Sequence, residues 1–152
     1  MAIRLSLKSN GSEVKSDGKD GTIDIISYSH GATAPVDADD GTTGHAAHSP
    51  VTITKRLDKA SPLIIKALTM SEPIEAEFKF TRPSLGKKGP DELIYTVKLE
   101  NGRVSSVNQS GAGDSDADPT EAVGLSYEKI TWTWTDGGVS HTDLWAEGEQ
   151  PG

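Results

Sequence analysis

Apolar and polar residues alternate along several short segments of the chain, as they do in strands that bury one face. The clearest alternation covers 74–81, where every second residue from Ile74 to Phe80 is apolar. A similar segment covers 3–8, and turn residues follow it at 16–21. Further strands are predicted at 23–31, 51–54, 92–100, 103–110, 121–129, 130–135 and 141–145. The pattern therefore predicts a mainly β protein.

One segment has the helical period instead. Ser61 and Pro62 supply an N-cap followed by proline at the first helical position, which predicts a helix over 62–70. At about 100° per residue, most of its apolar side chains share one face: Leu63, Ile64, Ala67, Leu68 and Met70. Ile65 lies opposite them. Because so short a helix is marginal alone, we expect it to flank the sheet and pack against it.

Two stretches between these elements carry strong local signals. Asn101-Gly102 favours a two-residue hairpin, so 92–100 and 103–110 are predicted to pair antiparallel. The segment 32–49 has no periodicity and is predicted to be one long protruding loop. Loops of this length are uncommon in a compact domain unless they are functional, so we expect contacts outside the subunit to order it. A polar tail from 147 is expected to fray.

Composition narrows the function classes. The 152 residues are predicted to form a single domain, 1–152. A formal net charge of -8 disfavours binding to nucleic acid, which depends on basic patches. No apolar run is long enough to insert into a membrane. The alternating N-terminal residues do not form the apolar core of a signal peptide, so the chain is expected to begin in the cytoplasm.

The candidate metal-binding patterns each lack a required residue. An acidic run has the spacing that opens a calcium loop: Asp114, Asp116 and Asp118. However, Pro119 stands where glycine is needed and Leu125 where the bidentate glutamate is needed. His45 and His48 lie in the irregular segment without a cysteine or an obvious third ligand for zinc. We therefore predict no metal and no cofactor.

Catalytic and ligand-stacking patterns are equally weak. Ser140, His141 and Asp143 are adjacent in a strand, but a nucleophilic triad needs spatial roles that adjacency does not supply. They are interpreted as surface residues. Trp132 and Trp134 alternate with polar residues and are interpreted, together with Tyr127, as part of the core. The chain is predicted not to be an enzyme.

Five blocks of sequence resemble one known family, the haemolysin-coregulated proteins (Hcp). The blocks are IDIISYSHG at 23–31, HSPVTITKRLDKASP at 48–62, AEFKFTRP at 76–83, ELIYTVKLENGRVSSV at 92–107 and LSYEKITWTWT at 125–135. The first turn and the short final hairpin depart from the family pattern. The resemblance implies two sheets that form a β-barrel with one flanking α-helix, and it runs nearly end to end.

The family forms the inner tube of type VI secretion systems, and its function is carried over as an expectation. The resemblance implies homohexameric rings that stack, contacts with sheath and spike proteins, and effector proteins carried in the lumen. The chain itself would be secreted without a signal peptide, to the outside or into a target cell. The segment 32–49 is expected to reach from ring to ring.

Residues of this segment and the misplaced apolar residue of the helix are the candidate subunit or ring interface. They are Pro35, Val36, Asp37, Asp39, Asp40, His45, His48 and Ile65. Two other functions stay open from the sequence. One is a tail-tube subunit of a phage or phage-like particle, which has the same architecture. The other is a monomeric ligand-binding β-sandwich that uses Trp132 or Trp134, which solution mass would distinguish from a ring.

Overall fold

Fourteen strands and one α-helix make up the part of the chain that the computed structural model describes, residues 1–34, 36–37, 41–42, 47–84 and 91–145. The strands are β1 Ala2–Ser9, β2 Ser12–Val14, β3 Ile23–Ile25, β4 Ser27–Ser29, β5 Ala32–Thr33, β6 Val36–Asp37, β7 Gly41–Thr42, β8 Ala47–His48, β9 Val51–Arg56, β10 Ile74–Arg82, β11 Glu92–Ser110, β12 Thr120–Ser126, β13 Lys129–Trp134 and β14 Val139–Leu144. The helix α1 is Ser61–Thr69, and a 3-10 turn covers Lys19–Gly21. The predicted mainly β protein with one helix is confirmed.

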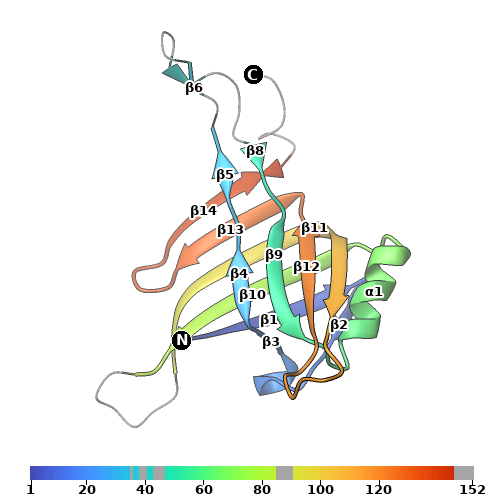
Figure 1. The fold of residues 1–152 in the computed structure, drawn as a ribbon. Helices are drawn as coiled ribbons and strands as arrows, with labels where there is room; N and C mark the ends of the chain where they lie inside the picture. The colour runs from blue at the N-terminus through green and yellow to red at the C-terminus, as the bar shows by residue number, and fades with distance from the viewer. Residues whose placement is uncertain (35, 38–40, 43–46, 85–90, 146–152) are drawn as a thin grey trace.

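The long strand β11 joins two sheets that lie at an angle to each other (Figure 1). Its first half pairs with β10 on one side and β13 on the other, and β10 pairs in turn with β1. Its second half pairs with β12, which continues through β9 to β4. All these ladders are antiparallel, and β14 extends the first sheet beyond β13.

The hairpin predicted at Asn101-Gly102 is wrong, because β11 runs through both residues without reversing. Asn101 adopts a φ of 49° and the register with β10 shifts beside it, so the pair forms a bulge in one continuous strand. A Cβ atom on Gly102 would collide with the carbonyl oxygen of Ser126. Asparagine tolerates the left-handed conformation and glycine allows the close approach, so the same dipeptide serves a corner between sheets.

The expected closed barrel is not confirmed. The strand path of the main sheet runs from β2 through β1, β10, β11, β12 and β9 to β4, and its described ladders form no closed circuit. The strand predicted over 23–31 is divided at the exposed residue Ile26. Its first part, β3, pairs with β1, and its second part, β4, pairs with β9. This divided segment therefore lies between the two sheets.

The core lies between the sheets and under α1. The helix begins and ends within one residue of its predicted bounds, and it buries Ser61, Ile64 and Ala67. The predicted apolar face is wrong in two members, because Leu63 and Met70 are exposed, 41% and 67% respectively. Ile65, which was predicted to lie opposite the apolar face, is half-buried and therefore less exposed than Leu63 and Met70.

The predicted loop 32–49 contains strand structure. Short antiparallel ladders join β5 to β8 and β6 to β7, and they project beyond the body of the molecule (Figure 1). We call this paired segment the arm. It continues the direction of β4 and β9, whose ladder lies directly below it (Figure 1). Consequently the arm starts from a defined base, which a structureless loop would not have.

Candidate assembly surface

Two histidines meet a tyrosine hydroxyl at the base of the arm. His30 follows β4, His48 ends β8, and Tyr127 lies in the turn between β12 and β13. The Tyr127 hydroxyl lies 2.7 Å from Nε2 of His30 and 2.8 Å from Nδ1 of His48. On the other side of His48, Nε2 lies 2.7 Å from a carboxylate oxygen of Asp143 on β14. We call these four residues the arm-base cluster.

Aromatic rings enclose the arm-base cluster. Trp145 stacks on the His48 ring with centroids 5.9 Å apart and meets Tyr127 edge-on at 4.9 Å. Trp132 lies 6.0 Å from the His30 ring and stacks on His141, with ring centroids 5.9 Å apart. His48 is buried and His30 is partly exposed. The cluster thus ties both strands of the arm to the end of β14.

Burial sets the titration of this cluster. It lowers the pKa of His30, the neighbouring His48 lowers that pKa further, and a hydrogen bond with the Ser49 backbone opposes both effects. Burial also raises the pKa of the Tyr127 hydroxyl, and the Asp143 carboxylate raises it further. Tyr127 therefore stays protonated at neutral pH and keeps one hydrogen to donate.

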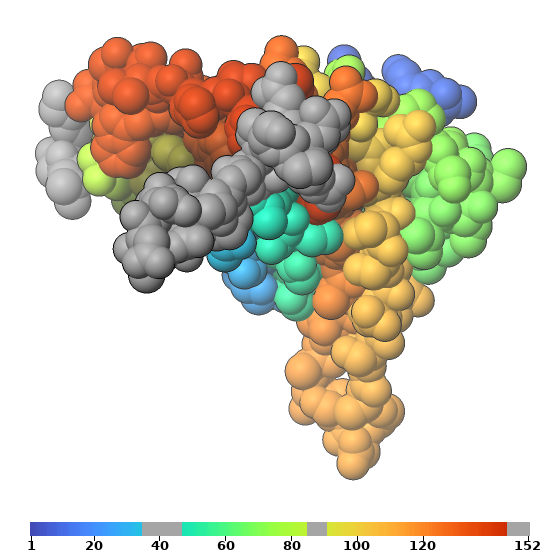
Figure 2. Space-filling model, turned by 90° about the horizontal axis from the view of Figure 1, so that it is seen from above, coloured from blue at the N-terminus to red at the C-terminus, as the bar shows by residue number. Residues whose placement is uncertain are grey.

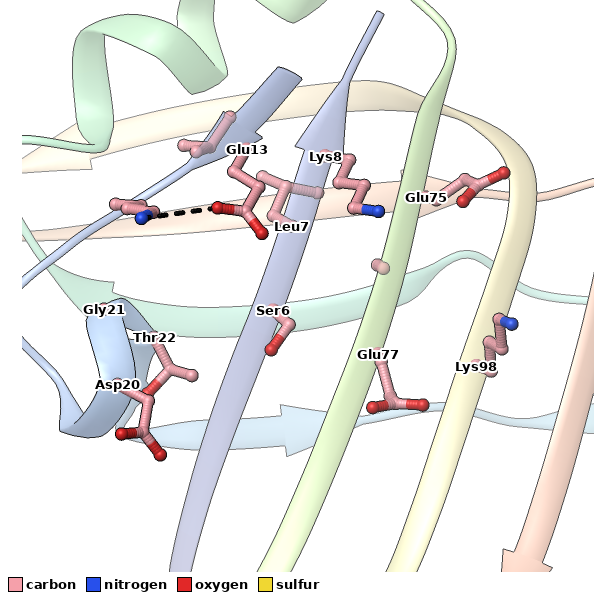
Figure 3. A pocket seen from close by; sticks show the side chains of 13 residues that line it. Ser6, Leu7, Lys8, Glu13, Asp20, Gly21, Thr22, Glu75, Glu77 and Lys98 are labelled. Carbon is pink, nitrogen blue, oxygen red and sulfur yellow. Dashed lines mark ion pairs between the residues drawn. The ribbon is translucent and has the colours of Figure 1, made fainter. Parts of the chain in front are cut away.

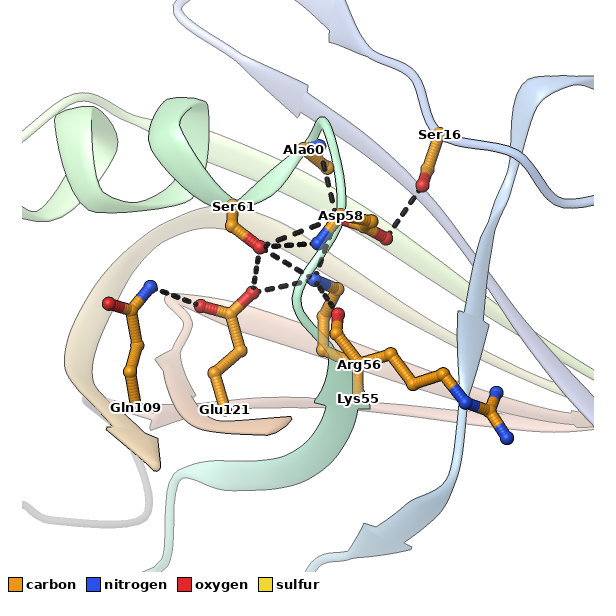
Figure 4. Close-up of polar contacts among 8 residues, drawn as sticks. All are labelled: Ser16, Lys55, Arg56, Asp58, Ala60, Ser61, Gln109 and Glu121. Atoms are coloured by element: carbon orange, nitrogen blue, oxygen red, sulfur yellow. Dashed lines mark hydrogen bonds and ion pairs between the residues drawn. The ribbon is translucent and has the colours of Figure 1, made fainter. Parts of the chain in front are cut away.

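A second polar cluster is buried where β9 turns toward α1 (Figure 4). The Lys55 ammonium and the Glu121 carboxylate, both fully buried, form an ion pair of 2.6 Å. Ser61, the first residue of α1, donates to the same carboxylate at 2.5 Å, and Gln109 donates at 3.2 Å to the other oxygen. The pair therefore joins β9, β11, β12 and the helix at one point.

Asp58 completes this network from the loop before the helix. Its carboxylate accepts from Lys55 at 2.9 Å, from the Ala60 backbone at 3.0 Å and from Ser16 at 2.6 Å. Burial by itself raises the pKa of Asp58, but the hydrogen bonds from Ser16 and Lys55 and the charge of Lys55 outweigh it, and the pKa lies below its ordinary value. The ionised carboxylate thus holds the start of α1 in place at neutral pH.

The outward face of the first sheet is polar and slightly hollowed. A hollow of about 230 Å³ opens over β1, β10 and β11 beside the 3-10 turn (Figure 3). Lys8 faces Glu75 across one ladder, and Glu77 faces Lys98 across the next. Opposite charges therefore alternate over this surface, which offers no concentrated charge to an ionic ligand.

Two pairs of exposed apolar side chains lie on opposite sides of the molecule. Trp134 and Val139 face each other across β13 and β14, and they are 43% and 68% exposed. On the other side, where Figure 1 shows α1, Leu63 in the helix and Met70 directly after its last residue are exposed. We call these the strand patch and the helix patch. The free edge of β14 borders the strand patch, because among the described ladders β14 pairs only with β13.

The strand patch is the outer end of an apolar row that packs against the core. Successive ladders place Ile3 opposite Phe80, Phe80 opposite Tyr95, and Tyr95 opposite Trp134. Ile3, Phe80 and Tyr95 are partly buried against the core, whereas Trp134 is exposed, so the interpretation of Trp134 as a core residue is wrong. Trp132 and Tyr127 do pack in or against the core.

The β11–β12 hairpin forms a separate projection on another side (Figure 2). Its tip, residues 111–119, is exposed throughout and includes the aspartates at 114, 116 and 118. Among the described residues, no group of three or more His, Cys, Asp or Glu side chains is placed to hold a metal ion. No helix in the described ranges has the length and apolar character needed to span a membrane.

The predicted interface residues fall into three groups. Pro35, Asp39, Asp40 and His45 lie outside the described residues. Val36 and Asp37 form β6 in the arm. His48 is buried in the arm base, so its side chain acts within the subunit, and Ile65 is half-buried on α1. An intersubunit role for these positions remains a prediction.

Sequence reasoning missed the residues that form both polar clusters. His30 and Asp143 were not connected to His48, and Asp143 was interpreted as a surface residue although its carboxylate binds a buried histidine. No local spacing links positions 30, 48, 127 and 143, because the strand order alone brings them together. Lys55 and Glu121 did carry a signal, since two charges interrupt otherwise apolar positions of their strands.

Comparison with known proteins places the chain in a family. The family described as "Type VI secretion system effector, Hcp" matches residues 6–134. The "Major exported protein" of Pseudomonas aeruginosa is 34% identical over 136 residues, which cover 85% of this chain and 78% of that protein. The chain therefore belongs to the Hcp family of the type VI secretion system.

Solved structures agree in fold over nearly the whole chain. A doubly substituted Hcp1 from the E. coli EAEC 042 pathovar is 34% identical, has a TM-score of 0.84, and matches over 95% of this chain and 99% of that one. The secreted protein Hcp3 from Pseudomonas aeruginosa is 26% identical with a TM-score of 0.73, over 95% and 97% of the two chains. The shared fold therefore covers nearly the whole of this chain and of each of these two structures.

Proposed function

We propose that this chain is a structural subunit of the type VI secretion inner tube. It forms homohexameric rings, the rings stack within the sheath and below the spike, and effector proteins are carried in the lumen. The chain is exported with them, as the name of its Pseudomonas relative says of that protein. The role is mechanical rather than enzymatic.

The two apolar patches on opposite sides of the subunit are the observation that carries this proposal. A contact between different surfaces of identical subunits repeats from copy to copy, and it closes into a ring when the rotation permits. The strand patch of one copy would lie against the helix patch of the next. Burying Trp134, Val139, Leu63 and Met70 in this way removes the most exposed large apolar side chains on these elements from water.

The proposal includes closure of the two sheets into a barrel. The segment 23–29 supports it, since β3 pairs with β1 and β4 pairs with β9 along one short stretch of chain. Ile26, between them, also donates its N–H to Thr54 of β9 at 2.8 Å. A barrel closed at this segment would be stiff enough to hold the arm and both patches in fixed relative positions.

The arm supports stacking, because it projects from the body and contributes no described side chain to the main apolar core except at its base. The test is to replace residues 34–46 with a short glycine-serine linker, which keeps the arm-base cluster. We expect the thermal midpoint of the subunit to change little and rings to form, while electron microscopy shows loss of stacked tubes and export from cells falls. Intact tubes with normal export would contradict the role of the arm, and loss of the rings themselves would place the arm within a ring.

A further inference from the structure

The contacts of the arm-base cluster fix how many polar hydrogens it needs. Three contacts join its members, from His30 to Tyr127, from Tyr127 to His48, and from His48 to Asp143. Asp143 accepts from Nε2 of His48, so Nδ1 of a neutral His48 accepts the Tyr127 hydrogen. The tyrosine oxygen then accepts from Nε2 of His30. Two neutral imidazoles and one hydroxyl therefore satisfy all three contacts.

One added proton can be accommodated in this arrangement. If Nδ1 of His48 is protonated, it donates to the Tyr127 oxygen, and the tyrosine hydrogen turns to the Ser49 carbonyl, 3.4 Å away. The charge on His48 then lies beside the Asp143 carboxylate at 2.7 Å. The cluster stays connected, although the hydrogen bond to Ser49 is long.

A second proton is opposed by the surroundings. His30 faces His48, with ring centroids 6.5 Å apart, and shares the Tyr127 hydroxyl with it. Its other described neighbours are the Ser49 backbone, whose hydrogen bond favours the protonated ring, and Trp132, which also stacks on His141 of β14. Burial and the nearby His48 outweigh the contact with Ser49. The only carboxylate seen among these contacts, Asp143, already binds His48. Two imidazolium ions in one aromatic enclosure would repel each other across a single hydroxyl.

We propose that the arm-base cluster is a pH-sensitive clasp, which holds the β5–β8 ladder against Tyr127 and β14 at neutral pH and releases it when both histidines are protonated. The position of the cluster gives the clasp its effect. His30 lies two residues before β5, His48 is the β8 residue paired with Ala32, and the backbone hydrogen bond from Ser49 to Gly31, 3.1 Å, closes the same end of the ladder. Protonation would therefore loosen the arm where it leaves the body.

The sign of the pH effect follows from His30. Its pKa in the closed state lies below the ordinary value of 6.5, so the open state binds more protons as the pH falls below 6.5. Opening is then favoured by acid, and the stability of the clasp is present at neutral pH and lost as pH falls toward the closed-state pKa. This inference concerns the subunit itself and does not depend on ring formation.

Hydrogen exchange of the Ser49 amide in the full chain measures the clasp directly. After correction for intrinsic exchange, its protection should fall about tenfold or more between pH 7 and pH 5. Amides of the β10–β11 ladder should keep their protection over the same range. The His30→Gln variant, which removes one titrating ring but keeps a hydrogen-bond donor, should lose the pH response at Ser49. The matched control is His141→Gln, because His141 stacks on Trp132 outside the hydrogen-bonded chain and its loss should leave the response unchanged.

Wild-type protein alone can decide the matter if His30→Gln does not fold. The ring titration of His30, followed by NMR, should coincide with the loss of Ser49 protection. Constant protection at Ser49 from pH 7 to 5, an equal loss across the β10–β11 ladder, or a full response in folded His30→Gln would each overturn the clasp.

Discussion

At the scale of single residues, the buried pair of Lys55 and Glu121 carries the largest energetic consequence. Removing two charges from water costs several kcal/mol per ion, and only good geometry with further hydrogen bonds offsets that cost. Here Ser61, Asp58 and Gln109 supply those bonds. The pair is therefore stable only when complete, and it fixes the start of α1 relative to β9 and β12.

Lys55→Met is expected to lower the free energy of unfolding by about 3–5 kcal/mol, because it leaves the Glu121 charge buried without its partner. Denaturant unfolding measures the change. The matched control is Lys59→Met, whose exposed ammonium lies 3.5 Å from exposed Asp17 and whose loss should cost less than about 1 kcal/mol. Adding Glu121→Leu to Lys55→Met should recover most of the loss. Similar small effects at both lysines would contradict this account of the network.

At two positions the structure depends on partners that are distant in the sequence, so local signals could not predict it. Asn101-Gly102 has the same local chemistry in a hairpin and in a bulge, since both need a left-handed residue followed by one without a side chain. Pairing with β10 and β12 decides between them, and those strands lie far away in sequence. His48 was similarly interpreted as part of a loop, because its partners Tyr127 and Asp143 meet it only through the fold.

At the scale of elements, the strands and the helix were largely predictable and their outward faces were not. Alternation located β1, β9, β10, β12, β13 and β14 to within a few residues, and the Ser61-Pro62 signal located α1. Periodicity gives a helix one apolar face, yet α1 has apolar residues on two. The pattern cannot tell which of them meets the subunit's own core, so Leu63 and Met70 were assigned to the wrong side.

The outer face of α1 gives a direct test of the subunit contact. Met70→Lys should weaken ring formation at least tenfold in the concentration required, because burying a lysine in an apolar contact is costly. A cation suits the C-terminal end of a helix, so the isolated subunit should keep its thermal midpoint. Analytical ultracentrifugation over a dilution series makes the measurement. Thr69→Lys, at the neighbouring exposed position, is the control. Equal behaviour of both variants would show that the helix patch faces solvent.

At the scale of the whole molecule, the Hcp family and the two opposed patches support the same account. An isolated subunit would leave both patches in water, together with the edge of β14 that no described strand pairs with. In the proposed ring, the strand patch of one copy would cover the helix patch of the next without any new element. The expectation of six subunits per ring comes from the resemblance to the Hcp family, because neither patch fixes the rotation between neighbouring subunits.

Native mass spectrometry of the purified chain at micromolar concentration tests the central claim most directly. The subunit has a mass of 16.1 kDa, and the account predicts a dominant species of about six times that mass, which corresponds to one closed ring. A monomer alone under these conditions would contradict it, and would favour a ligand-binding domain in which the two patches face solvent.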